Sequence, residues 1–142
     1  MNLVAAWIAS GALANYQTFP QWQLTHFGST NAPNALAAAD ADGDGVGNYA
    51  EYLLGTAPTN AASDWKVDIR LNGSNAQIVF PHIANRGFEV QVRSDLAAPP
   101  LWSPLDVPGN APFFPAVTFT NVVEDTGGSD TNKTYRVRLF AP

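Results

Sequence analysis

The chain has 142 residues, of which 46% are hydrophobic and only 13% are charged, so disorder caused by excess charge is excluded. It contains no Cys, which excludes a disulfide scaffold, a thiolate metal site and a Cys nucleophile. All seven Lys and Arg residues follow residue 65, so the net charge of −5 lies within the first 64 residues. This distribution argues against nucleic acid and anionic membranes as partners.

Residues 3–14 are apolar and no Lys or Arg precedes them. About twelve residues are too few to span a bilayer, and a secretory signal would need a basic start, so no membrane insertion is expected. We expect this segment to form a helix that packs on the domain. Because residues 1–18 carry no charge, the alternative is an apolar arm by which the chain joins an extracellular assembly as a subunit.

The first part of the chain, residues 1–58, is predicted to be helical, with short helices at residues 19–27, 33–39 and 48–54. Thr18 and Gln21 have the spacing of a capping box, which starts the helix over 19–27. Gly28 is expected to end it.

The helix over 48–54 has its own signals at both ends. Asn48 and Glu51 are expected to cap its beginning, and Gly55 is expected to end it. Residues 55–64 then read as a linker, because they are rich in Pro, Ser and Asn.

After the linker the hydrophobic period becomes two, which is typical of strands. Apolar and charged residues alternate over residues 65–71, and Asn72–Gly73 follows as a hairpin turn. Further strands are expected at residues 76–80, 88–92, 101–107, 116–123 and 135–139. We therefore predict an antiparallel β-sandwich over 65–142 that packs with the helices into one compact α+β unit.

Residues 40–51 have the sequence DADGDGVGNYAE, which matches a twelve-residue calcium loop at every ligand position. Ca²⁺ takes six to eight hard oxygen ligands, and alternate residues of a tight loop can direct their oxygens inward. Gly45 supplies the sharp turn, and Val46 contributes its backbone carbonyl. The predicted ligands are Asp40, Asp42, Asp44, Val46, Asn48 and Glu51.

One position departs from the EF-hand pattern. Position 8, which usually holds an aliphatic residue that pairs two loops, is Gly47 here, and the chain has no second loop of this kind. The segment before the loop is also too short to move as a regulatory helix. The sequence thus predicts a solitary structural calcium site and not half of a sensor pair.

The loop resembles those of dockerins and thrombospondin type 3 repeats. The string from FPQWQLTHFG through DADGDGVGNYAEYLLGTAP, followed by FEVQVRSDL, Trp102 and TYRVRLF, is similar to a module near the C-terminus of many large secreted bacterial proteins. This resemblance implies an extracellular or cell-surface accessory or anchoring module without catalytic activity, with a parent protein or cell-surface group as its partner. Ala57 departs from the usual string, which often has Asp there.

Two other functions were weighed. A carbohydrate-binding module would need exposed rings, and the strand faces are charged, so Trp102, Phe113 and Phe114 are the candidate polysaccharide-binding residues. We expect these rings instead to fill the core and close the ends of the sandwich. An enzyme is not expected, because His26 and His82 belong to no recognisable catalytic motif.

Overall fold

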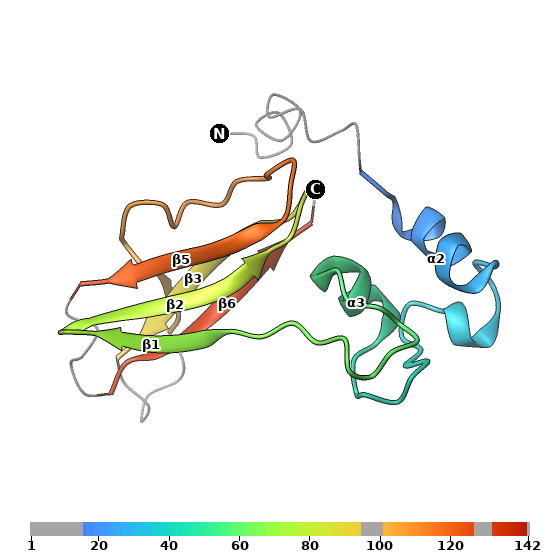
Figure 1. The fold of residues 1–142 in the computed structure, drawn as a ribbon, viewed down its shortest axis with the longest axis horizontal. Helices are drawn as coiled ribbons and strands as arrows, with labels where there is room; N and C mark the ends of the chain where they lie inside the picture. Colours follow the sequence, from blue (N-terminus) through green and yellow to red (C-terminus); the bar gives the residue numbers. More distant parts are fainter. Residues whose placement is uncertain (1–15, 95–100, 127–131, 142) are drawn as a thin grey trace. The chain divides into compact units, whose positions relative to one another are not determined.

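The computed structural model describes residues 16–94, 101–126 and 132–141, and the helix predicted over residues 3–14 lies outside them. The chain has a small α+β fold with short helices and two antiparallel three-stranded sheets (Figure 1). It divides between Trp65 and Lys66 into two compact units, here called the helical unit and the β unit. The boundary coincides with the end of the predicted linker, and packing of the two units into one body stays a prediction.

The helical unit contains α2 (Phe19–Phe27), the 3₁₀ turn η2 (Pro33–Ala35) and α3 (Asn48–Leu54). The capping box at α2 is formed as predicted, with both Thr18–Gln21 bonds present. Gly28 and Gly55 follow α2 and α3 in the left-handed conformation, with φ of 67° and 69°. The expected bounds of these two helices are therefore confirmed.

The helix predicted over residues 33–39 is wrong beyond Ala35, because Leu36 is already extended, with φ −62° and ψ 150°. The reason lies in the carbonyls of this segment, which are used by the start of α3. The Asn48 side-chain amide donates to the carbonyls of Asn34 and Leu36, both at 2.8 Å. A helix would have needed these carbonyls for its own bonds.

Aromatic side chains hold α2 and α3 together. Phe19 of α2 lies 5.1 Å from Tyr49 and 5.4 Å from Tyr52 of α3, measured between ring centroids. Trp22 and Tyr52 are buried, and the Tyr52 hydroxyl donates to the Gln17 carbonyl at 2.8 Å. This cluster fixes α3, the helix that carries Glu51.

The β unit consists of two sheets with the orders β1-β2-β5 and β4-β3-β6, every pair antiparallel. Figure 1 shows the two sheets facing each other as a sandwich. Phe80 of β2 and Phe88 of β3 meet between them with ring centroids 5.5 Å apart. The strands are β1 (Asp68–Asn72), β2 (Asn75–His82), β3 (Gly87–Arg93), β4 (Ser103–Pro104), β5 (Phe119–Asp125) and β6 (Thr134–Phe140).

The predicted hairpin is present, with Gly73 at φ 63° between β1 and β2. The first strand differs from its prediction in both length and burial. It begins at Asp68, and all its residues are exposed, including Ile69 at 56% and Leu71 at 71%. Because β1 is an edge strand with β2 as its neighbour, alternation fixes which face its side chains take but not how deeply they are buried.

The strand predicted over 101–107 shortens to Ser103–Pro104. Beyond β4, the Asn110 side chain bonds to the backbone groups of β3 that a longer strand would have used. Its Oδ1 accepts from the Val90 N–H at 2.7 Å, and its Nδ2 donates to the Val90 carbonyl at 2.8 Å. Asn110 also donates to the Leu105 carbonyl at 2.8 Å, and the Leu105 N–H donates to the Val90 carbonyl at 2.9 Å, so side-chain and backbone bonds together hold this segment beside β3. The strand predicted over 116–123 corresponds to β5, which begins three residues later than predicted, at Phe119.

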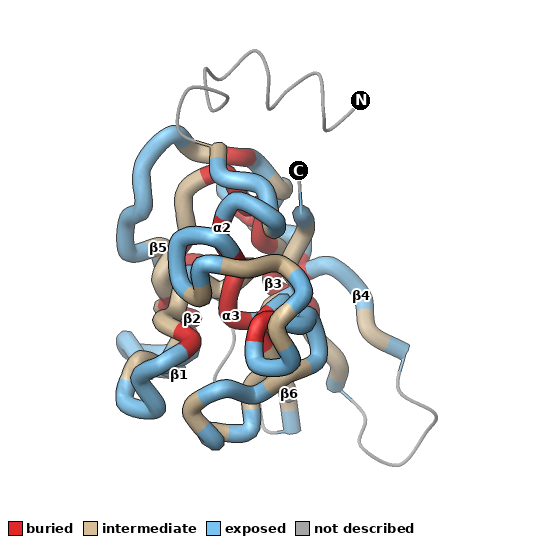
Figure 2. The backbone as a smooth tube through the Cα atoms, turned by 90° about the vertical axis from the view of Figure 1, so that its right-hand side faces the viewer, coloured by how far each residue is buried: buried red, intermediate tan, exposed pale blue. Residues whose placement is uncertain are grey.

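Burial is concentrated in separate stretches of the chain (Figure 2). Between the sheets, Ile78, Phe80 and Val90 are fully buried. Burial alternates along β2 as predicted, whereas in β3 Gln91 is buried and Val92 is only half-buried. Among the described residues, no helix has the length and apolar character needed to cross a membrane.

Candidate metal centre

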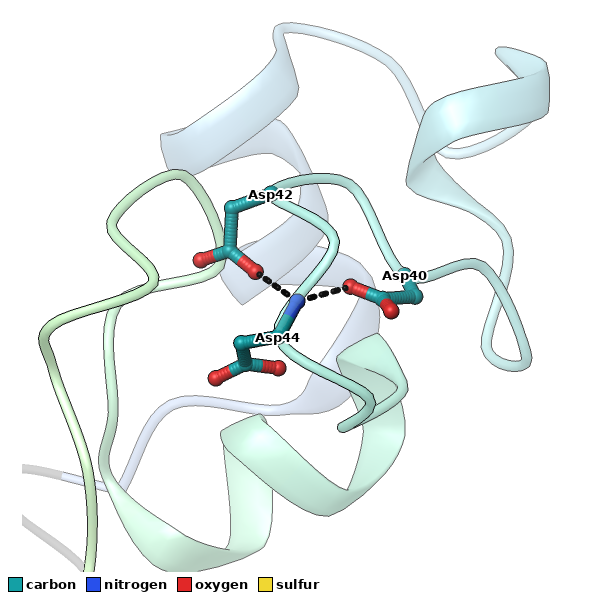
Figure 3. Close-up of side chains that lie close together, drawn as sticks. All are labelled: Asp40, Asp42 and Asp44. Carbon is teal, nitrogen blue, oxygen red and sulfur yellow. Dashed lines mark hydrogen bonds between the residues drawn. The ribbon is translucent and has the colours of Figure 1, made fainter.

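The loop between η2 and α3 is folded around the Asp40 carboxylate. Its two oxygens accept backbone N–H bonds from Gly43 at 2.8 Å, Asp44 at 3.2 Å and Gly45 at 2.9 Å. The Asp44 N–H also points at Asp42 Oδ1, at 3.3 Å (Figure 3). Gly43 and Gly45 have φ of 79° and 92°, a region that residues with a Cβ seldom adopt. The glycines of the motif are thus required by the turn itself.

These bonds bring three carboxylates together. One oxygen each of Asp40, Asp42 and Asp44 lies within 4.8 Å of the others. The N–H bond from Gly45 is the main influence that holds the pKa of Asp40 below its usual value, so this group stays ionised. Negative charges this close repel one another, and a cation would remove the repulsion.

Glu51 supplies a fourth carboxylate from the first turn of α3. It is fully buried, and the Thr56 hydroxyl donates to its Oε1 at 3.3 Å. The other oxygen, Oε2, is buried and has no hydrogen-bond partner. Burial is the largest cause that raises the pKa of Glu51, and the charges of Asp42, Asp44 and Asp40 raise it further. Glu51 therefore faces the field of the three aspartates without a proton donor for Oε2.

Asn48 does not cap α3 as expected, because Gly47 occupies the N-cap position and makes no side-chain bond. Asn48 is fully buried, and its amide nitrogen is used by the segment before the loop. Its Oδ1 is buried and has no partner. Asn48 thus anchors the loop and leaves an oxygen for another ligand.

Val46 lies between the aspartates and α3, and its backbone N–H donates to Asp44 Oδ1 at 2.7 Å. Only Gly47, the N-cap residue, separates Val46 from α3. The side chain of Val46 takes part in none of these bonds, as the loop pattern requires.

The two ends of the loop are joined by backbone bonds that the sequence did not predict. The N–H of Asn48 donates to the Ala39 carbonyl at 2.8 Å, and that of Tyr49 donates to Ala37 at 2.9 Å. A Cβ on Gly47 would lie 3.4 Å from the Ala37 carbonyl oxygen, and Gly47 has an ordinary φ of −78°, so the structure does not require a glycine at position 8. The loop is thus closed on its own entering segment, where paired EF-hands use a second loop.

The oxygens of this loop fit a hard divalent cation. Buried oxygens without partners come from Asp42, Asn48 and Glu51, of which Asp42 belongs to the aspartate cluster and Glu51 lies outside it, within its electrostatic field. Carboxylate, amide and carbonyl oxygens without nitrogen or sulfur ligands are typical of calcium sites. The structure thus brings the three aspartates together and places Glu51 in their field, while the binding of calcium stays a prediction.

The three rings considered for sugar binding lie in different surroundings. Phe114 is buried, so its ring presents no face to a ligand. Phe113 is 44% exposed, but its ring lies 4.6 Å from the ring of the buried His82. Trp102 is half-buried, with guanidinium groups from β3 and β6 against its ring. These rings do not form one platform.

No protein-family model matches this chain, and comparisons with curated proteins and with solved structures found no similar protein. The case for any function therefore depends on the residues and their geometry.

Proposed function

We propose that residues 40–51 bind one Ca²⁺ and that the chain is a calcium-stabilised, non-catalytic module that acts outside the cell. The observation that carries the calcium proposal is the unpartnered, buried Oε2 of Glu51 in the electrostatic field of three converging aspartates. A buried carboxylate oxygen without a partner is costly, and a bound cation would offset that cost.

The ion would connect the loop to the rest of the helical unit. Asp40, Asp42 and Asp44 lie in the loop, whereas Glu51 belongs to α3, which packs on α2 through Phe19 and Tyr52. A ligand that needs both sets of oxygens is bound by the folded unit only, and its binding energy then adds to stability. This supports a structural role and not a switch.

Action outside the cell rests on the resemblance to dockerin-like and thrombospondin-like loops, together with the affinity expected of a solitary site. Sites of this class have Kd values on the order of 10⁻⁶ to 10⁻⁴ M, well suited to the abundant calcium outside cells. An accessory or anchoring role is consistent with the absence of a recognisable catalytic arrangement in the sequence.

Isothermal titration calorimetry of the full chain with CaCl₂ tests the proposal. We expect one site in this affinity range, and its loss or strong weakening in Asp40→Ala and in Glu51→Gln, which removes the buried charge but keeps the side-chain size. Asp106→Asn, an exposed acid of the β unit, is the matched control and should bind as the unaltered chain does. Absence of calcium uptake by the unaltered chain would refute the proposal.

A further inference from the structure

The outer face of sheet β4-β3-β6 carries three arginines and a tryptophan. Arg93 of β3 lies opposite Thr134 in β6, and Arg136 and Arg138 alternate along β6 on the same face. Trp102 immediately precedes β4, which pairs with β3 beside Arg93. We call Arg93, Arg136, Arg138 and Trp102 the arginine face. It is the face turned away from the buried side chains Phe88 and Val90.

The three guanidinium groups are held in place by rings and an amide. The Cζ atoms of Arg93 and Arg136 lie 5.0 Å and 4.4 Å from the centroid of the Trp102 ring. Arg136 also donates through Nε to Gln91 Oε1 at 2.7 Å, and Arg138 lies over the Phe140 ring at 4.6 Å. Guanidinium groups fixed in this way lose little freedom when they bind an anion.

None of these three arginines forms an ion pair with another described residue, whereas Arg70 and Lys133 pair with Asp68 and Asp125. The nearest acid on the same face is Glu89, which stands opposite Arg138 in the register. Its Oε1 accepts instead from the Gln91 amide at 2.8 Å. In addition, the Nε of Arg93 is buried and has no partner. Within the described residues, these guanidinium groups are thus held in place but form no ion pair.

We infer that the arginine face binds a polysaccharide that carries carboxylate groups. Guanidinium groups bind carboxylates through paired hydrogen bonds, and repeated carboxylates along one polymer can engage several arginines. Arg and Trp side chains are also common at protein interfaces, so an acidic protein partner is the competing outcome, which the comparison with poly-glutamate below tests. The inference does not depend on calcium binding by the helical unit.

Affinity electrophoresis in native gels containing sodium polygalacturonate tests this inference, with gels of neutral dextran for comparison and EDTA in all of them. We expect the full chain to be retarded by polygalacturonate and not by dextran, and less so as salt rises. Arg136→Gln and Arg138→Gln should each weaken binding by about tenfold or more, because each removes a charge-assisted contact. Arg70→Gln, which removes the same charge from the other sheet, should bind as the unaltered chain does.

Several results would overturn the inference. They are an absence of retardation, equal loss of binding in Arg70→Gln, and equal binding to poly-glutamate or single-stranded DNA. Retention that needs calcium and disappears in Asp40→Ala would assign the binding to the metal loop instead. If Arg136→Gln melts early by circular dichroism, Arg138→Gln decides, because Arg138 is exposed and contacts only Phe140 among the contacts described above. Calcium uptake is measured separately, so either proposal can fail without the other.

Discussion

The two units of this chain are stabilised by different chemistry. In the β unit the fully buried side chains are mostly apolar, with Phe80, Ile78 and Val90 between the sheets. In the helical unit the fully buried side chains include Asn48 and Glu51, both of which keep an oxygen without a partner. The β unit also has a buried oxygen without a partner, on Asn85, but only in the helical unit do the described residues combine such oxygens with a cluster of carboxylates, which a cation would neutralise. The comparison predicts that the two units respond differently to core truncation, chelation, acid and loss of a cap.

The largest expected effect is that of truncating the β core. Phe80→Ala should lower the free energy of unfolding of the β unit by about 3–5 kcal/mol, because a fully buried ring leaves a cavity. Thermal unfolding followed by hydrogen exchange would show earlier exchange in peptides from residues 66–94. Calcium affinity by calorimetry should stay unchanged, because the predicted ligands all belong to the helical unit, and a large change in it would contradict this expectation.

Removal of calcium by a chelator should destabilise the helical unit and leave the β unit unaffected. At a free calcium concentration about 100 times Kd, binding to the folded form alone adds about 2.7 kcal/mol, which EDTA removes. Hydrogen exchange should therefore accelerate in peptides from residues 16–65 on addition of EDTA. Peptides from residues 66–94 serve as the internal control, and an unchanged pattern in both sets would exclude a structural role for the ion.

Acid should affect the β unit through His82. Burial is the main cause that lowers the pKa of this fully buried imidazole, in spite of two nearby backbone carbonyls. Because the folded pKa lies below the ordinary value near 6.5, the stabilisation is complete above pH 6.5 and is lost as pH falls from there toward the folded pKa. A single group changes stability by at most about 1.4 kcal/mol per pH unit.

Nuclear magnetic resonance titration of the His82 ring signals measures this directly. We expect the ring to stay neutral below pH 6.5 while the unfolding midpoint of the β unit declines. A titration midpoint at or above 6.5 would contradict the prediction. His26 belongs to the helical unit, and burial also lowers its pKa, so its signals give a comparison within the same sample.

The smallest effect concerns the start of α2. Thr18→Ala removes the capping box that Thr18 and Gln21 form, and should cost the helical unit about 1 kcal/mol. Chemical denaturation followed by Trp22 and tyrosine fluorescence would measure the loss. Thr120→Ala, at an exposed position of β5, is a suitable control that should leave the helical unit unaffected.

Local signals predicted the helices well where the hydrogen bonds at the helix ends join residues close in sequence. The Thr18–Gln21 pair and Gly28 define α2 at both ends, because caps act over three or four residues. The prediction failed over residues 36–39, where carbonyls bond to the distant Asn48. No local pattern reports a bond across twelve or more residues.

The candidate site shows the same limit. The loop pattern named the aspartates and Glu51, since alternate ligands and a required glycine leave a mark in the sequence. The loop pattern did not predict that the Asn48 side chain anchors the loop. In the β unit, alternation did not predict that Ile69 and Leu71 would be exposed on an edge strand. The unpaired state of Arg93, Arg136 and Arg138 was also missed, because the sequence suggested a charge-paired sheet and Glu89 bonds to Gln91 instead.

The closure of the metal loop by Asn48 and Tyr49 has a consequence for the choice of ion. Because backbone bonds to Ala39 and Ala37 already join the two ends, the loop has little freedom to contract. Mg²⁺ needs oxygens at about 2.0–2.1 Å in a nearly octahedral arrangement, whereas Ca²⁺ accepts about 2.3–2.6 Å and irregular shells. If the loop binds a cation as proposed, these bonds between its two ends would oppose contraction onto the shorter distances of Mg²⁺ and so favour Ca²⁺.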